Sequence, residues 1–93
     1  MVNSFTGAVY FRKWDDGLVE VQVYAYNASG SSSYSDKIIC TLPVGYRPSL
    51  IARGAFHTSR LGFSVDGYIY DSGAIHTQTV GAYYHFARFA YRV

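Results

Sequence analysis

Side chains that could bind a carbohydrate are abundant in this chain. Its 93 residues include ten tyrosines, one tryptophan and three histidines. A sugar ring presents apolar C–H faces and a rim of hydroxyl groups, so protein sites pair a flat aromatic ring with a few fixed polar groups. Most aromatic residues of a small domain belong to its core, so only some of these side chains can serve a ligand. The composition therefore favours carbohydrate recognition without indicating which residues perform it.

We predict a saccharide pocket that combines one stacking ring with polar side chains near an Asp-Gly pair. Trp14 precedes an Asp-Asp-Gly turn, where a lone tryptophan serves either as a sugar platform or as a lid over one end of the domain. The other members are chosen because they lie on predicted outward strand faces or at loop edges. The predicted saccharide-binding residues are Trp14, Asp36, His57, Arg60, Asp66, Tyr68 and His76.

Catalytic chemistry has less support in the sequence. No Gly-x-Ser-x-Gly segment is present, and neither His57 nor His76 lies in a known nucleophile motif. A glycosidase needs two carboxylates beside the sugar, yet four of the six acidic residues lie in turn contexts, where Asp favours the backbone geometry by itself. Only Glu20 and Asp36 lie on predicted strands. We therefore expect a binding protein without catalytic residues, and a small glycan hydrolase is the less favoured alternative.

The three histidines are the candidates for a metal site, because imidazole nitrogens from separate strands can converge on zinc. His57, His76 and His85 are far apart in the sequence and have no His-x-His or Cys partner motif. We therefore expect neither a metal within one subunit nor a cofactor. The axis of a trimer could still bring together three copies of one histidine.

Charge and cysteine content set further limits on partners. The formal net charge is +2 and no run of Lys or Arg occurs, which argues against nucleic acid. Neither a secretory signal nor a run of about 18 apolar residues is present, so we expect no membrane insertion. Cys40 is the only cysteine, which excludes an intrachain disulfide and fits folding in a reducing cytoplasm. Its alternation with Ile38 and Leu42 predicts a buried structural thiol.

The size and composition predict one domain, residues 1–93, that associates with other chains. A domain of this length buries only about 60–65% of its unfolded surface. Charged residues make up 15% of the chain against 49% hydrophobic residues, so part of the apolar surface is expected to meet another subunit. Tyr24 and Tyr26 lie opposite the valines of an alternating segment, together with Glu20 and Gln22. We expect this face to serve as a subunit interface rather than as a ligand site.

Period-2 alternation and turn signals predict an all-β fold, a small antiparallel barrel or sandwich. No segment holds a 3.6-residue apolar stripe over three turns, so no helix is predicted. The pair Asp66-Gly67 between two short β-branched and aromatic runs predicts a hairpin turn, and the chain as a whole is expected to form a meander. The predicted strands are 5–13, 18–26, 34–42, 50–57, 61–65, 68–70, 74–80 and 83–92.

Both prolines lie in one segment, Leu-Pro-Val-Gly-Tyr-Arg-Pro at 42–48. Proline lacks an amide donor and belongs at strand ends, so this segment predicts a turn in which Gly45 takes a left-handed conformation. In order along the chain stand Trp-Asp-Asp-Gly-Leu-Val at 14–19, Thr-Leu-Pro-Val-Gly-Tyr-Arg-Pro at 41–48 and Val-Asp-Gly-Tyr-Ile at 65–69. This ordered set resembles the C-terminal head domains of phage tail-tip proteins, above all the receptor-binding proteins of lactococcal and related Gram-positive phages. The resemblance covers roughly residues 9–70, and residues 71–93 match only in being strand-like.

The resemblance implies a homotrimer of small β-barrels that binds a saccharide of the host cell wall without enzymatic activity. It implies a shallow pocket near or between subunits, lined by Trp, His, Arg and Asp. A location in the virion at the phage tail tip follows, with assembly in the host cytoplasm and other phage tail proteins as partners. On this comparison residues 1–93 could form the C-terminal part of a longer tail protein. The alternative is a purely structural tail or baseplate trimerisation module, in which the aromatic residues pack between subunits.

Overall fold

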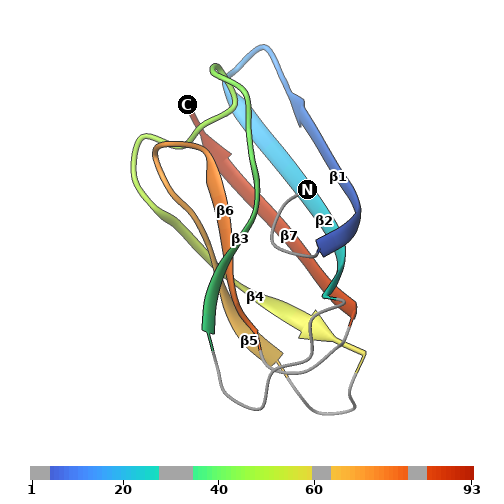
Figure 1. The fold of residues 1–93 in the computed structure, drawn as a ribbon. Helices are drawn as coiled ribbons and strands as arrows, with labels where there is room; N and C mark the ends of the chain where they lie inside the picture. The colour runs from blue at the N-terminus through green and yellow to red at the C-terminus, as the bar shows by residue number, and fades with distance from the viewer. Residues whose placement is uncertain (1–4, 28–34, 60–63, 80–83) are drawn as a thin grey trace.

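The computed structural model of this chain is all-β, as its sequence predicts (Figure 1). It describes residues 5–27, 35–59, 64–79 and 84–93. Within these residues lie the strands β1 (Phe5–Lys13), β2 (Leu18–Asn27), β3 (Ser35–Thr41), β4 (Ala52–Thr58), β5 (Ser64–Ile69), β6 (Ala74–Thr79) and β7 (Tyr84–Arg92).

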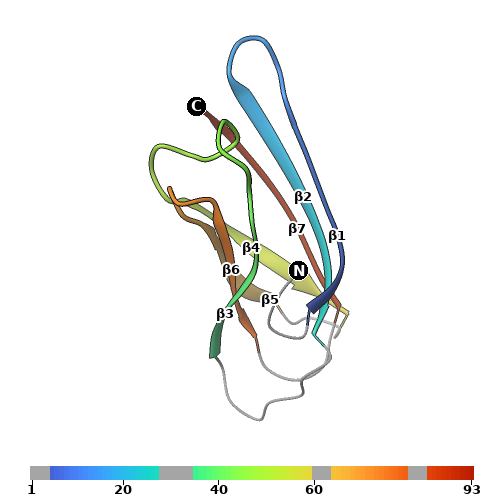
Figure 2. The same ribbon diagram turned by 45° about the horizontal axis from the view of Figure 1, so that its top comes forward.

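All these strands belong to one antiparallel sheet with the order β1-β2-β7-β4-β5-β6-β3. The sheet curls into a nearly closed barrel. Figure 2 shows β1, β2 and β7 as one wall and β3, β5 and β6 as the opposite wall, with β4 crossing between them. Curling brings the two end strands of the sheet toward each other and shields edges that would otherwise pair with other chains.

The expectation of a simple meander is wrong. β4, β5 and β6 do follow one another as neighbours, but β3 crosses over to pair with β6, which completes a Greek key. β7 then enters between β2 and β4. Alternation defines the two faces of each strand and leaves its neighbours undefined, so this order could not be read from the sequence.

The core lies between the two walls and is almost entirely apolar. Val19, Val21, Val23 and Ala25 all point inward from β2, as their alternation predicts. Full burial of such side chains contributes about 1.5–3 kcal/mol each for Val or larger residues. Two buried polar residues, Thr77 and His85, complete the interior. The buried apolar cluster comprises Phe5, Val19, Val21, Val23, Ala25, Ile39, Leu42, Phe56, Val65, Ile69, Ile75 and Phe89.

A bulge in β3 changes which side chains of this strand point toward the core, compared with the prediction from alternation. Ile38 pairs with His76 and Cys40 with Ile75, so Ile39 is the extra residue, and its side chain is fully buried. Cys40 shares the inward side with Leu42 as expected, but Ile38 points outward. The thiol packs half-buried against the core, and burial raises its pKa. This arrangement agrees with a structural role.

The pair Asp66-Gly67 forms no hairpin turn, contrary to the prediction. Both residues lie inside β5, where Gly67 pairs with Gly54 of β4. A Cβ atom on Gly67 would come within 2.5 Å of the Phe56 ring, so the glycine makes room for a buried aromatic side chain. The predicted strands over 61–65 and 68–70 are therefore one continuous strand where the structure describes them, and residues 61–63 lie outside the described part.

Two similar turns form the hairpins at one end of the barrel. In the β1–β2 turn, Gly17 donates to the Trp14 carbonyl over 3.0 Å and has φ +86°, while the Asp16 carboxylate accepts from the Leu18 N–H. This is the three-residue hairpin loop that ends with glycine in a left-handed conformation. Arg92 lies 3.0 Å from the same carboxylate, and the two contacts hold the pKa of Asp16 below its usual range.

The β5–β6 turn repeats this design. Gly73 has φ +87° and donates to the Tyr70 carbonyl over 2.8 Å, and the Ser72 hydroxyl accepts from the Ala74 N–H. The Gly73 carbonyl also accepts a hydrogen bond from the Leu42 N–H. The turn after β5 therefore lies four residues beyond the predicted Asp-Gly position and anchors the start of the 42–48 segment.

The 42–48 segment closes one end of the barrel. Gly45 has φ +99°, as predicted, and Tyr46 donates to the Pro43 carbonyl over 3.2 Å. The Tyr46 ring contacts Phe11 of β1 edge-on at a centroid distance of 5.0 Å, and the Tyr91 hydroxyl of β7 donates to the Tyr46 carbonyl. The segment therefore bridges the walls where β1 and β3 do not pair. Arg47, half-buried, does not project to solvent, since its Nε donates to the Leu42 carbonyl over 2.9 Å.

Candidate functional site

The outward side of β1, β2, β7 and β4 forms a broad aromatic surface. β2 contributes the alternate residues that were predicted to share one face. In the pairing of β2 with β7, Tyr24 lies opposite Phe86 and Tyr26 opposite Tyr84. Ala8 of β1 lies beside Tyr24 on the other side. We call this surface the aromatic face. Its members are Tyr10, Gln22, Tyr24, Tyr26, His57, Tyr84, Phe86 and Arg88.

Ring contacts hold the aromatic side chains of this face in place. Tyr24 meets Phe86 edge-on at a centroid distance of 5.4 Å, and Tyr26 lies 4.8 Å from Tyr84. Tyr84 and Phe86 are parallel within 8° at 6.3 Å. Cross-strand aromatic pairs of this kind stabilise a sheet by about 0.2–1 kcal/mol each. The rings still present surface to solvent, since Tyr24 is 48% and Tyr84 53% exposed.

The central part of the aromatic face is a shallow hollow of about 400 Å³. Tyr24 and Phe86 line it together with three polar side chains, Gln22, His57 and Arg88. The amide of Gln22 both donates and accepts, and the guanidinium of Arg88 only donates. Among the described residues Arg88 forms no ion pair. The hollow therefore combines flat apolar rings with available hydrogen-bonding groups.

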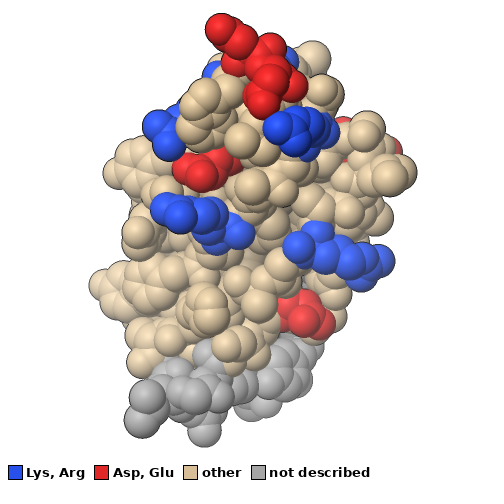
Figure 3. All heavy atoms as spheres, turned by 180° about the vertical axis from the view of Figure 1, so that it is seen from behind, with Lys and Arg blue, Asp and Glu red and all other residues tan. Residues whose placement is uncertain are grey.

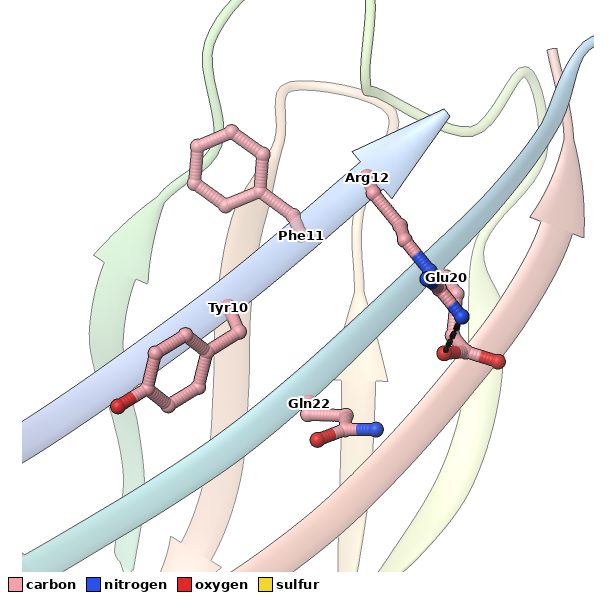
Figure 4. A pocket seen from close by; sticks show the side chains of 5 residues that line it. All are labelled: Tyr10, Phe11, Arg12, Glu20 and Gln22. Atoms are coloured by element: carbon pink, nitrogen blue, oxygen red, sulfur yellow. Dashed lines mark ion pairs between the residues drawn. The ribbon is translucent and has the colours of Figure 1, made fainter. Parts of the chain in front are cut away.

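A second hollow of about 350 Å³ lies between the outer parts of β1 and β2. Figure 4 shows Tyr10, Gln22 and the pair of Arg12 and Glu20 on one side of the two strands, with Phe11 directed to the other side. Arg12 Nη2 lies 3.6 Å from Glu20 Oε1. The two opposite charges offset each other. Among the described residues that line this hollow, Tyr10, which is 61% exposed, and Gln22 are the polar groups outside the ion pair.

A third hollow of about 510 Å³ opens beside the other end of β2. None of the seven residues that line it is charged. Gly7 of β1 contributes bare backbone, because a Cβ atom there would lie 2.1 Å from the Tyr24 carbonyl oxygen. The residues lining it are Thr6, Gly7, Tyr24, Ala25, Tyr26, Tyr84 and Phe86.

Charge is spread thinly over the molecule. Figure 3 shows one side of the barrel, on which Lys and Arg alternate with Asp and Glu in small separate groups, and uncharged surface lies between them. Two ion pairs, Arg12 with Glu20 and Arg92 with Asp16, account for part of this pattern. No strong field of one sign results on this side, in agreement with the low formal charge.

Trp14, the predicted stacking ring, lies at the β1–β2 turn and apart from the other predicted residues. It is 39% exposed, and the Arg12 guanidinium lies over its ring at 4.2 Å from the centroid. A hollow of about 330 Å³ there is lined by Trp14, Asp15, Asp16 and Leu18, and by none of the other predicted pocket residues. Within the described residues of one chain, Trp14 therefore shares no hollow with His57 or His76.

Three predicted residues do come together on the outward side of β5 and β6. Tyr68 pairs with His76 across the strands, and Asp66 lies two residues before Tyr68 on the same side. His76 stacks on Tyr70 at a centroid distance of 4.2 Å, and the Arg53 guanidinium lies 5.4 Å from the Tyr68 ring. These contacts occupy the ring faces with neighbouring side chains. No hollow among those described is lined by this group.

The remaining predicted site residues are His57, Asp36 and Arg60. His57 is exposed on β4 and is the only predicted pocket residue that lines the central hollow. Asp36 belongs to β3, where its backbone pairs with Gln78, and its side chain lies outside the described part. Arg60 lies outside the described residues altogether. His85, which the sequence left open, is fully buried between the rings of Phe5 and Phe56.

Acidic and metal-binding side chains do not cluster in the described part of the chain. No group of three or more His, Cys, Asp or Glu side chains there could hold a metal ion. Glu20 is the only carboxylate among the described residues that line the three hollows of the aromatic face. The described residues also contain no helix long and apolar enough to span a bilayer.

No known protein family, curated protein or solved structure matches this chain. The resemblance to phage head domains therefore rests on the sequence motifs at 14–19, 41–48 and 65–69.

The sequence does contain a signal for the aromatic face, but an incomplete one. Alternation placed Tyr24 beside Gln22 on the outward side of β2 and grouped Tyr84 with Phe86 and Arg88 on one side of β7. Alternation does not indicate that β2 pairs with β7, and it is this pairing that joins the outward residues of the two strands into one surface.

Proposed function

We propose that this chain is a non-enzymatic saccharide-binding head, of the kind that phage tail tips use to attach to a cell-wall saccharide of their host. The observation that carries the proposal is the central hollow of the aromatic face. There the cross-strand pair of Tyr24 and Phe86 lies beside Gln22, His57 and Arg88. Exposed rings beside uncommitted polar side chains are the combination that a sugar requires.

Each group has a distinct part in such binding. The ring of Tyr24 packs against the C–H face of a sugar, since nearly half of the side chain is open to solvent. Gln22 and Arg88 direct hydrogen bonds to the hydroxyl rim, and His57 adds one from β4. The hollow is shallow, so a single site binds weakly. Several heads on one particle raise the overall affinity by avidity without any new contact.

Assembly as a homotrimer in the virion, alongside other tail proteins, is part of this proposal. It is supported by the small size of the domain and by large apolar side chains left in solvent within the 42–48 segment and two residues after it. Val44 and Leu50 are each 81% exposed. Covering such side chains in an interface is favourable by about 25 cal/mol for each Å² removed from water.

A second candidate function is a structural trimerisation module of a tail or baseplate. The uncharged hollow beside Tyr26 and Tyr84 favours it, because the centre of a subunit interface is depleted in charge and enriched in aromatic residues. This is the role that the alternation along β2 predicts for the side with Tyr24 and Tyr26. In this case the aromatic face would be covered by another subunit and would bind no sugar.

Calorimetric titration with cell-wall saccharide fragments from candidate Gram-positive hosts, phosphate-bearing ones included, tests the proposal. We expect binding in the micromolar to millimolar range, and Tyr24→Ala should weaken it about ten-fold because it removes the stacking ring. Tyr68→Ala is the matched control, since Tyr68 lies on the outward side of β5 and lines none of the three hollows. Absence of binding to every fragment by the folded protein would refute the proposal. A loss with Tyr68→Ala alone would move the site to β5 and β6.

A further inference from the structure

We infer that the aromatic face binds an extended, neutral saccharide chain that lies along β2 over several sugar units, rather than one terminal sugar. This inference rests on the proposed function and specifies its ligand. It follows from how the three hollows are joined, from their length and from their charge.

The three hollows form one continuous track. The hollow at Tyr10 and the central hollow share Gln22, and the central hollow shares Tyr24 and Phe86 with the hollow at Tyr84. All three are lined by residues of β2, so they follow one another along this strand. A ligand held at the centre can continue into both neighbouring hollows without leaving the surface.

The track is longer than one sugar ring. From Glu20 to Tyr26 the strand advances six residues, about 20 Å at roughly 3.3 Å per residue. Each part of the track has its own exposed aromatic ring, namely Tyr10 at one end, Tyr24 at the centre and Tyr84 at the other end. These rings come from three neighbouring strands, Tyr10 from β1, Tyr24 from β2 and Tyr84 from β7. Rings placed at successive points of the track match a ligand that presents an apolar face at intervals, as a chain of pyranose units does.

The few charged residues along the track indicate whether the bound saccharide chain is neutral or charged. The hollow at Tyr84 has no charged lining residue, and in the hollow at Tyr10 the charges of Arg12 and Glu20 neutralise each other. Arg88 at the centre is the one Lys or Arg lining the track that forms no ion pair among the described residues. A nucleic acid or polyanionic chain would require a row of such cations, so a neutral hydroxylated chain fits best.

The experiment compares ligands of increasing length. A neutral cell-wall polysaccharide from a Gram-positive host is partly hydrolysed and sized into fragments of one, two, four and eight sugar units. Each fragment is titrated calorimetrically into the full chain at a fixed salt concentration. We expect the Kd per chain to fall by about ten-fold or more from the one-unit to the four-unit fragment and then to level off, because the track is then filled.

Three single substitutions locate the ligand along the track. Tyr24→Ala should weaken binding of every fragment, since the central ring is used by all of them. Tyr10→Ala and Tyr84→Ala should weaken binding of the four- and eight-unit fragments alone. Both side chains are more than half exposed, so their removal leaves the core intact. Tyr68→Ala, which lies off the track, should leave all four affinities unchanged.

The outcomes separate this inference from the proposed function. If no fragment binds, the proposed function fails and the inference with it. If fragments bind with a Kd that does not depend on length, and Tyr10→Ala and Tyr84→Ala have no effect, the saccharide site stands and the extended track is refuted. If Tyr84→Ala instead lowers the mass of the assembly in light scattering, the track is a contact with a second copy of the chain and the inference is likewise refuted.

Discussion

Gly67 shows how a residue type that favours turns can be required by packing instead. Gly67 and Gly54 face each other across β5 and β4. The rings of Phe56 and Phe89, whose centroids are 5.9 Å apart, lie over these two glycines. An Asp-Gly pair predicts a hairpin from local preference alone. Core packing outweighs the local turn preference here, because a side chain larger than hydrogen at either glycine would displace a buried ring.

Gly67→Ala should therefore lower the free energy of unfolding by about 1–3 kcal/mol, the usual cost of adding a methyl group to a packed core. The added Cβ atom would lie 2.5 Å from two carbons of the fully buried Phe56 ring, which has no room to move. Urea unfolding at pH 7 measures the change. The exposed neighbour provides the control, since Asp66→Ala should shift the unfolding free energy by no more than about 0.5 kcal/mol.

A second variant distinguishes crowding from backbone strain at this position. Combined with Phe56→Leu, the Gly67→Ala substitution should cost less than it does in the otherwise unchanged chain, because the smaller side chain leaves space for the methyl group. Equal costs in both backgrounds would show that the ring is not what Gly67 accommodates.

At the scale of elements, the sequence predicted strand positions well and strand neighbours only in part: β1 pairs with β2, and β4, β5 and β6 are consecutive neighbours, as in a meander, but the places of β3 and β7 in the sheet were not predicted. The bounds of β1 were predicted as they are found, and those of β2 to within one residue, because their alternation is long and regular. β5 was split because Asp66-Gly67 imitates a turn. The inward side of β3 was misassigned at Ile38 because a bulge changes the period without leaving a mark in the sequence.

The 42–48 segment, which carries the most specific motif, is tied to the barrel by Tyr91. The Tyr91 hydroxyl donates to the Tyr46 carbonyl, and burial raises the pKa of Tyr91 to about 12. In the unfolded chain the phenol ionises near pH 10. Stability from this group is therefore fully present below about pH 10 and is lost as the pH rises toward 12.

We expect Tyr91→Phe to be less stable than the unchanged chain by about 1 kcal/mol at pH 7, the net contribution of one hydrogen bond. Between pH 10 and pH 12 its stability should fall less steeply, since the group that resists ionisation is gone. Urea unfolding at a series of pH values gives both quantities. Tyr10→Phe, which removes a solvent-exposed hydroxyl, should follow the unchanged chain. Parallel curves for the Tyr91→Phe variant and the unchanged chain would exclude the assigned role.

At the scale of the whole molecule, the candidate site exists only because of the strand order. The sequence suggested a sugar site from residue types, and its predicted members among the described residues fell on separate parts of the barrel, at the β1–β2 turn, on β3, on β4 and on β5 with β6. His57 reaches the central hollow because β4 pairs with β7. Non-local pairing of this kind has no local sequence signal, so a surface assembled from four strands could not be foreseen residue by residue.

The number of chains that act together can be measured in solution. If the head is a homotrimer, light scattering should give three times the chain mass of 10.4 kDa. Val44→Asp combined with Leu50→Asp should shift the mass toward a single chain, because both side chains are largely exposed and an interface that covers them would have to bury the new charges. The double variant should keep its β-type circular dichroism, since neither residue belongs to the core.

A single-chain mass for the unchanged protein at all concentrations would refute the trimer while leaving the saccharide site open to its own test. Dissociation that also abolished sugar binding would place part of that site on a neighbouring subunit.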